Sequence, residues 1–265
     1  MTFKALKGNN RMSKIISIHS FRGGTGKSNI TANLATIIAQ QSQRVGVIDT
    51  DIQSPGIHIL FGLDAAKMDR ALNDYLWGRC AVEETAYDVG EGKVTVMGGD
   101  IYIIPSSLKA GEISRVLREG YDVSLLNDGF RELISRLNLD YLFIDTHPGL
   151  NEETLLSIAI SDVLLIILRP DQQDYQGTAV AVDVARKLNI PSMFLVVNKV
   201  LTSFDFAEVK RAMEKTYGCQ VAGVLPLSED MVRLASAGIF CLRYPDHPLT
   251  QGLMAITDRI TEATS

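Results

Sequence analysis

The feature that most constrains this chain is a glycine-rich segment near its amino terminus. Residues 22–28 read RGGTGKS, an apolar run at 14–19 precedes them, and a helical pattern begins at Lys27. A strand, a glycine-rich loop and a helix in this order form the setting of a phosphate-binding loop, where backbone N–H groups and a helix N-terminus face a polyphosphate. The common template has glycine where this chain has Phe21. The loop also carries a second cation, Arg22, five residues before the lysine.

The side chains of this loop suit a magnesium–nucleotide complex. Lys27 is expected to reach the β- and γ-phosphates, and the Ser28 hydroxyl is expected to hold Mg²⁺. The glycines let the backbone curl close around the phosphates, where a Cβ would obstruct it. The loop residues predicted to bind the nucleotide are Gly23, Gly24, Thr25, Gly26, Lys27, Ser28 and Asn29.

Short apolar runs alternate with longer helical patterns along the chain. This alternation predicts right-handed βαβ units, and hence an α/β fold with a doubly wound, mostly parallel sheet and helices on both faces. Ligands of such sheets lie beyond the carboxyl ends of the strands. We predict strands at 14–19, 44–48, 101–104, 141–144, 163–168, 193–197 and 221–225, and helices at 27–40, 122–138, 152–160, 175–188, 205–217, 229–237 and 249–261.

Two stretches depart from this alternation. Residues 1–12 are polar and basic and predict a flexible N-terminal tail. Residues 64–100 are acidic and rich in turn formers, so we expect an irregular connection there, with a small hairpin at 93–97. No low-complexity linker or repeat divides the rest, which predicts a single P-loop domain over 13–265.

Carboxylates follow two of the predicted strands. Asp49 and Asp51 come at the end of one apolar run, and Asp145 comes directly after another. Carboxylates at strand ends beside the loop suit metal coordination or the orientation of an attacking water, and an apolar strand that ends in Asp is the Walker B pattern. Asp is also common at strand ends for purely structural reasons, so Asp49 and Asp51 taken alone are compatible with a structural or a chemical role.

Composition narrows the function classes. The net charge of −5 argues against a surface that is basic all over, although it leaves room for a local basic patch. Three cysteines, Cys80, Cys219 and Cys241, lie far apart without a C-x-x-C pair, which argues against a zinc site or a disulfide framework. No apolar stretch approaches the length of a membrane-spanning helix. These features predict a cytoplasmic protein.

On these residues the chain resembles the MinD/ParA group of deviant Walker A ATPases. The segments that carry the resemblance are 21–28, 49–55, 145–149, 198–199 and 223–226, and the likeness extends from about residue 13 to about residue 262. The resemblance implies an ATP-dependent sandwich dimer. It also implies that partners on DNA, on membrane or on cargo switch the dimer by stimulating hydrolysis.

The resemblance further implies roles for single residues. Asp51 is similar to the switch I aspartate that orients the attacking water, and Asp145 to the switch II aspartate near Mg²⁺. Asn198 is similar to the asparagine that reads the adenine edge, although Asn198-Lys199 also reads as a simple turn after a strand. The implied catalytic residues are Asp51, Lys27 and Arg22; further nucleotide-binding residues are Asn198, Lys199 and Pro226; and the Mg²⁺ ligands are Ser28, Asp49, Asp51 and Asp145.

Two positions depart from the family pattern. The extra cation of the family is a lysine that reaches the phosphates of the partner subunit, whereas this chain has Arg22. Arginine keeps the charge and can bind two phosphate oxygens, so the same role in trans, a reorganised dimer and a solvated arginine all stay open. His147 stands where relatives usually have proline. It is expected either to sense phosphate or pH or to be a satisfied polar side chain.

The partner surface is the least defined part. Lys210, Arg211 and Lys215 fall on one predicted helix and suit non-specific DNA, but acidic residues lie among them. The last helix has an apolar stripe with one basic residue, Arg259, so membrane binding is less expected than packing on the sheet. We expect an ATP-dependent homodimer and a protein activator or cargo adaptor, in the cytoplasm or at the nucleoid.

The sequence favours one function over two others. The favoured function is a Mg²⁺-dependent ATPase switch that positions or partitions a plasmid, a chromosome or a protein assembly. The alternative is a nucleotide-gated binding or regulatory module with negligible hydrolysis, which Arg22 motivates. A metal-cluster carrier is disfavoured because the three cysteines do not resemble the placement that bridges a dimer.

Overall fold

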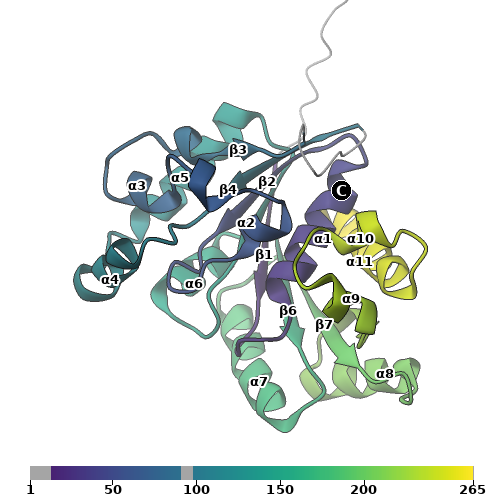
Figure 1. Ribbon diagram of the computed structural model, residues 1–265. Coiled ribbons are helices and arrows are strands. Elements are labelled where there is room, and N and C mark those ends of the chain that lie inside the picture. Colours follow the sequence, from purple (N-terminus) through teal and green to yellow (C-terminus); the bar gives the residue numbers. More distant parts are fainter. Residues whose placement is uncertain (1–12, 91–97, 265) are drawn as a thin grey trace, which may run out of the picture.

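A computed structural model describes residues 13–90 and 98–264 (Figure 1). The predicted tail at 1–12 and the predicted hairpin at 93–97 lie outside the described residues. Within the described residues, strands and helices alternate along the chain as the sequence predicts. None of the described helices combines the length and the apolarity that crossing a bilayer would require.

An eight-stranded sheet forms the centre of the molecule, in the order β3-β4-β2-β5-β1-β6-β7-β8. Every neighbouring pair is parallel except β3 and β4, which run antiparallel at one edge. The predicted α/β fold with a mostly parallel sheet is therefore confirmed. The strands are β1 Lys14–His19, β2 Arg44–Asp49, β3 Tyr87–Asp88, β4 Asp100–Ile104, β5 Tyr141–Asp145, β6 Val163–Leu168, β7 Ser192–Val200 and β8 Gln220–Pro226.

Helices cover both faces of this sheet (Figure 1). The helices α1, α2, α10 and α11 pack on one face, while α5, α6, α7 and α8 pack on the other. The described helices are α1 Lys27–Ala39, α2 Ile57–Leu60, α3 Leu72–Leu76, α4 Ala110–Glu119, α5 Ser124–Leu137, α6 Glu152–Ala159, α7 Gln172–Lys187, α8 Phe206–Tyr217, α9 Glu229–Leu234, α10 Phe240–Arg243 and α11 Pro248–Thr264.

The two-sided burial explains why the central strands are continuous apolar runs. In β5, Phe143 packs in the core on the side of α1, and its neighbours Leu142 and Ile144 pack in the core on the side of α5. Successive side chains of a strand point to opposite faces, so a strand covered on both sides favours apolar residues at every position. This pattern fixes β5 in the middle of the sheet, directly beside β1 and β2.

The structure differs from the sequence prediction mainly between the long elements. Residues 64–90, expected to be irregular, contain α3, two short 3₁₀ turns (Ala65–Lys67 and Val82–Thr85) and β3. The helices α2, α4 and α10 were not predicted. The helix α9 ends at Leu234 rather than at residue 237, because Ala235 (φ 47°) and Ser236 (φ 62°) are left-handed and stop it.

The last helix lies against the sheet, as the sequence favoured. Its apolar stripe is buried, with Ile256 and Ile260 both at 0 % exposure. Gly223 on β8 makes room for this helix, since a Cβ there would stand 2.6 Å from Cγ1 of Ile256. The apolar face of α11 is thus used inside the molecule.

Candidate functional site

The glycine-rich loop joins β1 to α1 at the carboxyl edge of the sheet. Gly24 (φ +75°) and Gly26 (φ +96°) adopt a backbone conformation that side chains with a Cβ rarely take. At Gly26 a Cβ would also lie 2.6 Å from Nδ2 of Asn198. The backbone conformation of the turn therefore favours glycine at both positions, and the nearby side chain of Asn198 also requires glycine at position 26.

Phe21, in the place of the usual first glycine, anchors the loop to α7. A Cβ on Gly177 would lie 2.2 Å from Cδ1 of Phe21, so the ring rests directly on the helix backbone at that glycine. The side chain is 36 % exposed, so its other face is open to solvent. Phe21 thus packs outside the loop and leaves the interior of the loop unobstructed.

Lys27 begins α1 and lies beneath the loop among buried groups. Its residue exposure is 8 %, and its positive charge lowers the pKa of His19 and offsets part of the raised pKa of Asp145. Burial first, and then Lys27, lowers the pKa of His19 to about 3, so this imidazole is neutral. Thr146 Oγ1 donates to the carbonyl of Ile18 (2.9 Å), and therefore accepts from Nδ1 of His19 (3.1 Å).

Asp145 ends β5 next to the start of α1. Burial is the main cause that raises its pKa, and the negative charge of Asp51 adds to it; Lys27 and a hydrogen bond from Ser28 act in the opposite direction. Thr31 Oγ1 lies 3.3 Å from Oδ1 of Asp145. The structure therefore brings Lys27, Ser28 and Asp145 together, as the sequence predicted for a magnesium–phosphate site.

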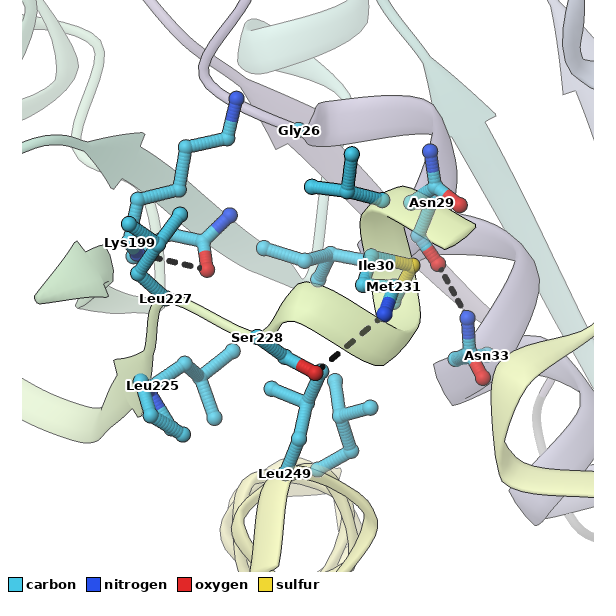
Figure 2. A pocket seen from close by; sticks show the side chains of 14 residues that line it. Gly26, Asn29, Ile30, Asn33, Lys199, Leu225, Leu227, Ser228, Met231 and Leu249 are labelled. Carbon is cyan, nitrogen blue, oxygen red and sulfur yellow. Dashed lines mark hydrogen bonds between the residues drawn. The ribbon is translucent and has the colours of Figure 1, made fainter. Parts of the chain in front are cut away.

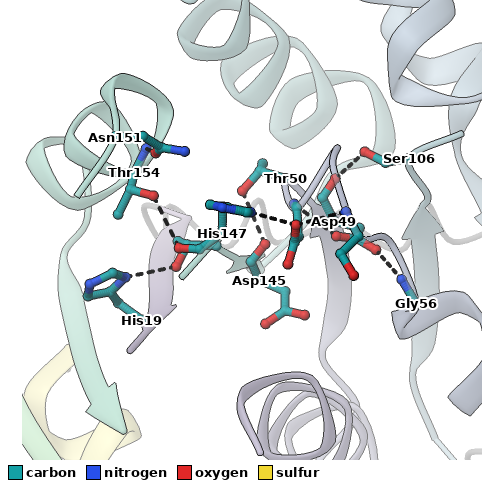
Figure 3. A network of polar contacts seen from close by, with 12 residues as sticks. His19, Asp49, Thr50, Gly56, Ser106, Asp145, His147, Asn151 and Thr154 are labelled. Carbon is teal, nitrogen blue, oxygen red and sulfur yellow. Dashed lines mark hydrogen bonds and ion pairs between the residues drawn. The ribbon is translucent and has the colours of Figure 1, made fainter. Parts of the chain in front are cut away.

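Asp49 shapes the loop that follows β2 (Figure 3). Its two carboxylate oxygens accept the backbone N–H groups of Asp51 and Gly56, each at 3.0 Å, and Ser106 Oγ donates to its carbonyl at 2.7 Å. Burial and the neighbouring Asp145 raise the pKa of Asp49 well above its usual range. Both of its oxygens already accept hydrogen bonds, so Asp49 has a structural role whether or not it also contacts a metal.

Asp51 makes a direct contact between the loop after β2 and the loop after β5. Nδ1 of His147, which follows β5, lies 2.7 Å from Oδ1 of Asp51. A carboxylate only accepts, so Nδ1 carries the proton and donates. The side chains are 24 % and 15 % exposed, which makes this a partly buried pair. His147 is therefore hydrogen-bonded to the residue that the resemblance assigns to water orientation.

A pocket opens beside the loop, between α1, the ends of β7 and β8, and α11 (Figure 2). Leu225, Leu249 and Leu253 give it an apolar wall, while Asn29, Asn33 and Asn198 supply polar groups. Pro226 and Lys199 also line it. An apolar space with a few amides next to a phosphate-binding loop is suited to a nucleotide base.

Arg22 occupies the exposed side of the loop. Ser20 Oγ donates to its carbonyl at 2.6 Å, while no carboxylate in the described part of the chain pairs with its guanidinium. An exposed arginine beside the phosphate-binding loop is placed to meet an anion from outside the subunit.

Comparison with known proteins identifies the family. A family model described as NUBPL iron-transfer P-loop NTPase, of the ParA type, matches residues 11–261. The chain belongs to this family. It is thus a P-loop NTPase of the MinD/ParA type, as the loop and the two acidic motifs indicated.

Individual relatives agree with this assignment. An uncharacterised ATP-binding protein of Methanocaldococcus jannaschii is 27 % identical over 253 residues, which covers 95 % of this chain and 89 % of the relative. An iron–sulfur cluster carrier protein of Pyrococcus furiosus is 23 % identical over 260 residues, covering 92 % and 84 %. The septum site-determining protein MinD of Pyrococcus horikoshii, solved with Mg-ADP, superposes with a TM-score of 0.79 at 19 % identity, covering 94 % of this chain and 96 % of that one.

The residues of this family member fit a magnesium–nucleotide complex. The loop has left-handed glycines where a Cβ would obstruct it, and Thr25 Oγ1 is buried with no hydrogen-bond partner in the described residues. No group of three His, Cys, Asp or Glu residues in the described ranges forms a ready metal site. Mg²⁺ does not need one, because it binds through one or two carboxylates together with substrate phosphates and waters.

Several residues of the site were missed from the sequence. Thr31 could have been found, since it lies one helical turn after Lys27 on the same face of α1. His19 and Ser106 carried no signal beyond their positions at the ends of strands. The contact of Phe21 with Gly177 depends on the strand order and could not be read from the chain.

Proposed function

We propose that this chain is a Mg²⁺-dependent ATPase that acts as a nucleotide-switched homodimer. Its task would be to position or partition a cargo such as a plasmid, a chromosome or a protein assembly. The observation that carries the proposal is the convergence of Lys27, Ser28, Asp145 and Asp51 at one edge of the sheet. The family membership supports the same chemistry.

Binding of the triphosphate follows from the loop. Lys27 would pair with the β- and γ-phosphates, and its low exposure would strengthen the attraction. Ser28 and Asp145 would hold Mg²⁺, with Asp49 and Asp51 nearby, and the metal would neutralise charge on the phosphates. Burial first, and then the neighbouring carboxylates, raise the pKa values of Asp49 and Asp145, and a bound cation would stabilise both carboxylates in their charged form.

Hydrolysis would depend on Asp51. Phosphoryl transfer is catalysed mainly by positioning and electrostatic stabilisation, so the group that orients the attacking water must itself be fixed. His147 Nδ1 and the N–H of Ser54 both donate to Oδ1 of Asp51. That leaves Oδ2 of Asp51 to accept from a water.

A second subunit would complete the site through Arg22. Its exposed position and the absence of a carboxylate partner within the described residues support a contact with the phosphates of the partner subunit. An arginine finger supplied in trans stabilises the charge of the transition state in other P-loop enzymes. ATP binding would then promote the dimer, and hydrolysis would release it.

Iron–sulfur cluster carriage, which the name of the Pyrococcus furiosus relative mentions, has less support in this chain. Burial raises the pKa of Cys219 to about 11 and that of Cys241 to about 12, so neither thiol readily forms the thiolate that binds iron. Burial also raises the pKa of Cys80. A four-iron cluster takes four thiolates, and one half-exposed cysteine per subunit would supply two in a dimer.

ATP turnover tests the proposal. Wild-type protein is expected to release phosphate from Mg-ATP at a rate well above that of Lys27→Ala, either alone or with DNA or anionic liposomes. If wild type and Lys27→Ala release phosphate at equal rates under all of these conditions, the ATPase proposal is wrong and the alternative, a nucleotide-gated binding module, is favoured. Co-sedimentation with DNA and with liposomes, with and without ATP, would identify the surface on which the protein works.

A further inference from the structure

Two residues from β7 reach across the sheet and bind the backbone of the phosphate-binding loop. Nδ2 of Asn198 donates to the carbonyl of Thr25 at 2.7 Å, and Nζ of Lys199 donates to the carbonyl of Gly24 at 2.8 Å. The strand β6 lies between β7 and β1, so these contacts join segments that are two strands apart. Two successive carbonyls of the loop are thus held from one side.

The local structure is adapted to these contacts. The end of β7 is irregular, with a register shift against β8 between Val197 and Val200. Lys199 has a φ of +60°, which costs free energy for a residue with a Cβ. Oδ1 of Asn198 accepts the N–H of Lys199 at 2.9 Å, which fixes the amide orientation. The glycine at position 26 leaves the space that Nδ2 of Asn198 occupies.

Peptide geometry gives these contacts a consequence for anion binding. A trans peptide unit is planar, and its C=O and N–H bonds point in opposite directions. Every described peptide bond is trans. Holding the carbonyls of Gly24 and Thr25 toward β7 therefore turns the N–H groups of Thr25 and Gly26 to the other side of the loop. These amides have no protein acceptor in the described residues and are free to bind an anion.

We propose that Asn198 and Lys199 clamp the phosphate-binding loop in its anion-binding shape, and so position the polyphosphate independently of the base. The inference rests on the proposed nucleotide binding at this loop. It assigns Asn198 this task in place of the adenine contact that the family resemblance implies. Asn198 is 9 % exposed and already uses one N–H on Thr25, so its loss would leave the Thr25 carbonyl buried and unpaired.

The test compares two ligands, Mg-ATP and magnesium tripolyphosphate, which share the phosphates and differ in the nucleoside. Isothermal titration of Asn198→Ala is expected to show roughly tenfold weaker binding of both ligands by the same factor, as expected when a buried hydrogen bond is lost. Lys199→Met, which keeps the carbon stem, is expected to weaken both by a smaller equal factor. Lys187→Met, which removes another exposed lysine far from the loop, is the matched control and should change neither.

Hydrogen exchange of the nucleotide-free protein gives a second measurement that needs no ligand. The N–H of Ile30, which donates to the carbonyl of Gly26 at the end of the loop, is expected to exchange faster in Asn198→Ala and Lys199→Met than in wild type, while the β-strand amides keep their protection. Retained protection of the strands also shows that the variants are folded.

Different results would overturn different statements. If Asn198→Ala weakens ATP but not tripolyphosphate, Asn198 reads the base and the clamp is wrong. Unchanged exchange at the N–H of Ile30 would also contradict the clamp. If wild-type protein binds neither ATP nor tripolyphosphate, the nucleotide-binding proposal fails and the clamp fails with it.

Discussion

The hydrogen bond between His147 and Asp51 joins the loop after β2 to the loop after β5 at a single atom. Oδ1 of Asp51 receives this bond at 2.7 Å and a second one from the N–H of Ser54 at 3.1 Å. His147 itself is fixed through its carbonyl, which accepts from Thr154 Oγ1 at the start of α6. A movement of either loop would therefore change the orientation of the proposed water-orienting carboxylate.

Replacing His147 tests this coupling. His147→Leu removes the donor, and we expect the kcat of ATP hydrolysis to fall about tenfold with little change in KM, because a hydrogen bond that orients Asp51 is lost. His147→Asn places an amide N–H near the position of Nδ1 and should recover part of the rate. Steady-state kinetics of the two variants decide the question. Wild-type turnover by His147→Leu would mean that the pair only stabilises the fold.

Asp145 provides a prediction on stability and pH. Burial and the charge of Asp51 raise its pKa in the folded protein above the unfolded value of 3.8. The folded state therefore keeps the proton of Asp145 to higher pH than the unfolded state does. Wild-type stability falls as the pH rises from 3.8 through the folded pKa, and it stays at the lower value above the folded pKa. Asp145→Asn does not titrate. Without nucleotide and Mg²⁺, we expect its melting temperature to exceed that of wild type near pH 7 and to approach it at low pH.

Thermal unfolding between pH 3 and pH 8 measures this difference. In the presence of Mg-ATP the order should reverse, because the variant loses the proposed carboxylate ligand and hence the stabilisation by bound ligand. A difference in melting temperature that is the same at every pH would show that the charge of Asp145 is not its cause.

At the scale of helices and strands, the docking of α11 on β8 depends on one missing side chain. Gly223→Ala would place a Cβ 2.6 Å from Cγ1 of Ile256, whose side chain is fully buried. Overpacking of this kind costs about 1–3 kcal/mol, and we expect urea unfolding to show a loss of that size. Gly111→Ala is the control, since a Cβ at Gly111 meets nothing within 4 Å in α4, and it should stabilise by about 0.4–1 kcal/mol. An unchanged midpoint for Gly223→Ala would contradict the close packing of α11.

The same scale shows what the sequence could and could not predict. The central strands were found because each is buried on both faces and reads as a continuous apolar run. The helix α4 was missed although Ile113, Val116 and Leu117 form an apolar stripe at helical spacing, so its sequence did carry a signal. The four-residue helices α2 and α10 are too short to show a helical period. The site residues at strand ends were predictable, whereas the contacts of Asn198 with Thr25 depend on a strand order that the chain does not state.

At the scale of the whole molecule, the strand order places all the predicted chemistry on one edge. The strands β1, β2 and β5 lie side by side, so the loops after them form one surface with Arg22 at its exposed side. The pocket lined by Asn29, Asn198 and Pro226 opens on the same edge, beyond β7 and β8. A second subunit that met this edge would lie over both the phosphates and Arg22.

This arrangement predicts how assembly depends on ATP. In an Asp51→Asn background, which should preserve ATP by slowing hydrolysis, we expect a dimer in Mg-ATP and a monomer in Mg-ADP. Adding Arg22→Ala should raise the dimer dissociation constant by roughly 10²- to 10⁴-fold, because the homodimer loses two charged hydrogen bonds, each of which contributes about 1.5–3 kcal/mol. Arg22→Lys should restore most of the affinity, because lysine keeps the positive charge. The recovery should be incomplete, because lysine cannot bind two phosphate oxygens with a planar fork.

Sedimentation velocity over a range of protein concentrations measures these constants, while titration of ATP into each variant checks that nucleotide affinity per subunit is unchanged. Arg118→Ala is the matched control, because Arg118 is an exposed arginine on α4 that has no ion pair among the described residues. If Arg22→Ala dimerises as tightly as its parent, the guanidinium does not cross to the partner. The exposed cation would then be a solvated arginine, and the dimer, if it forms, would be held by other groups on this edge.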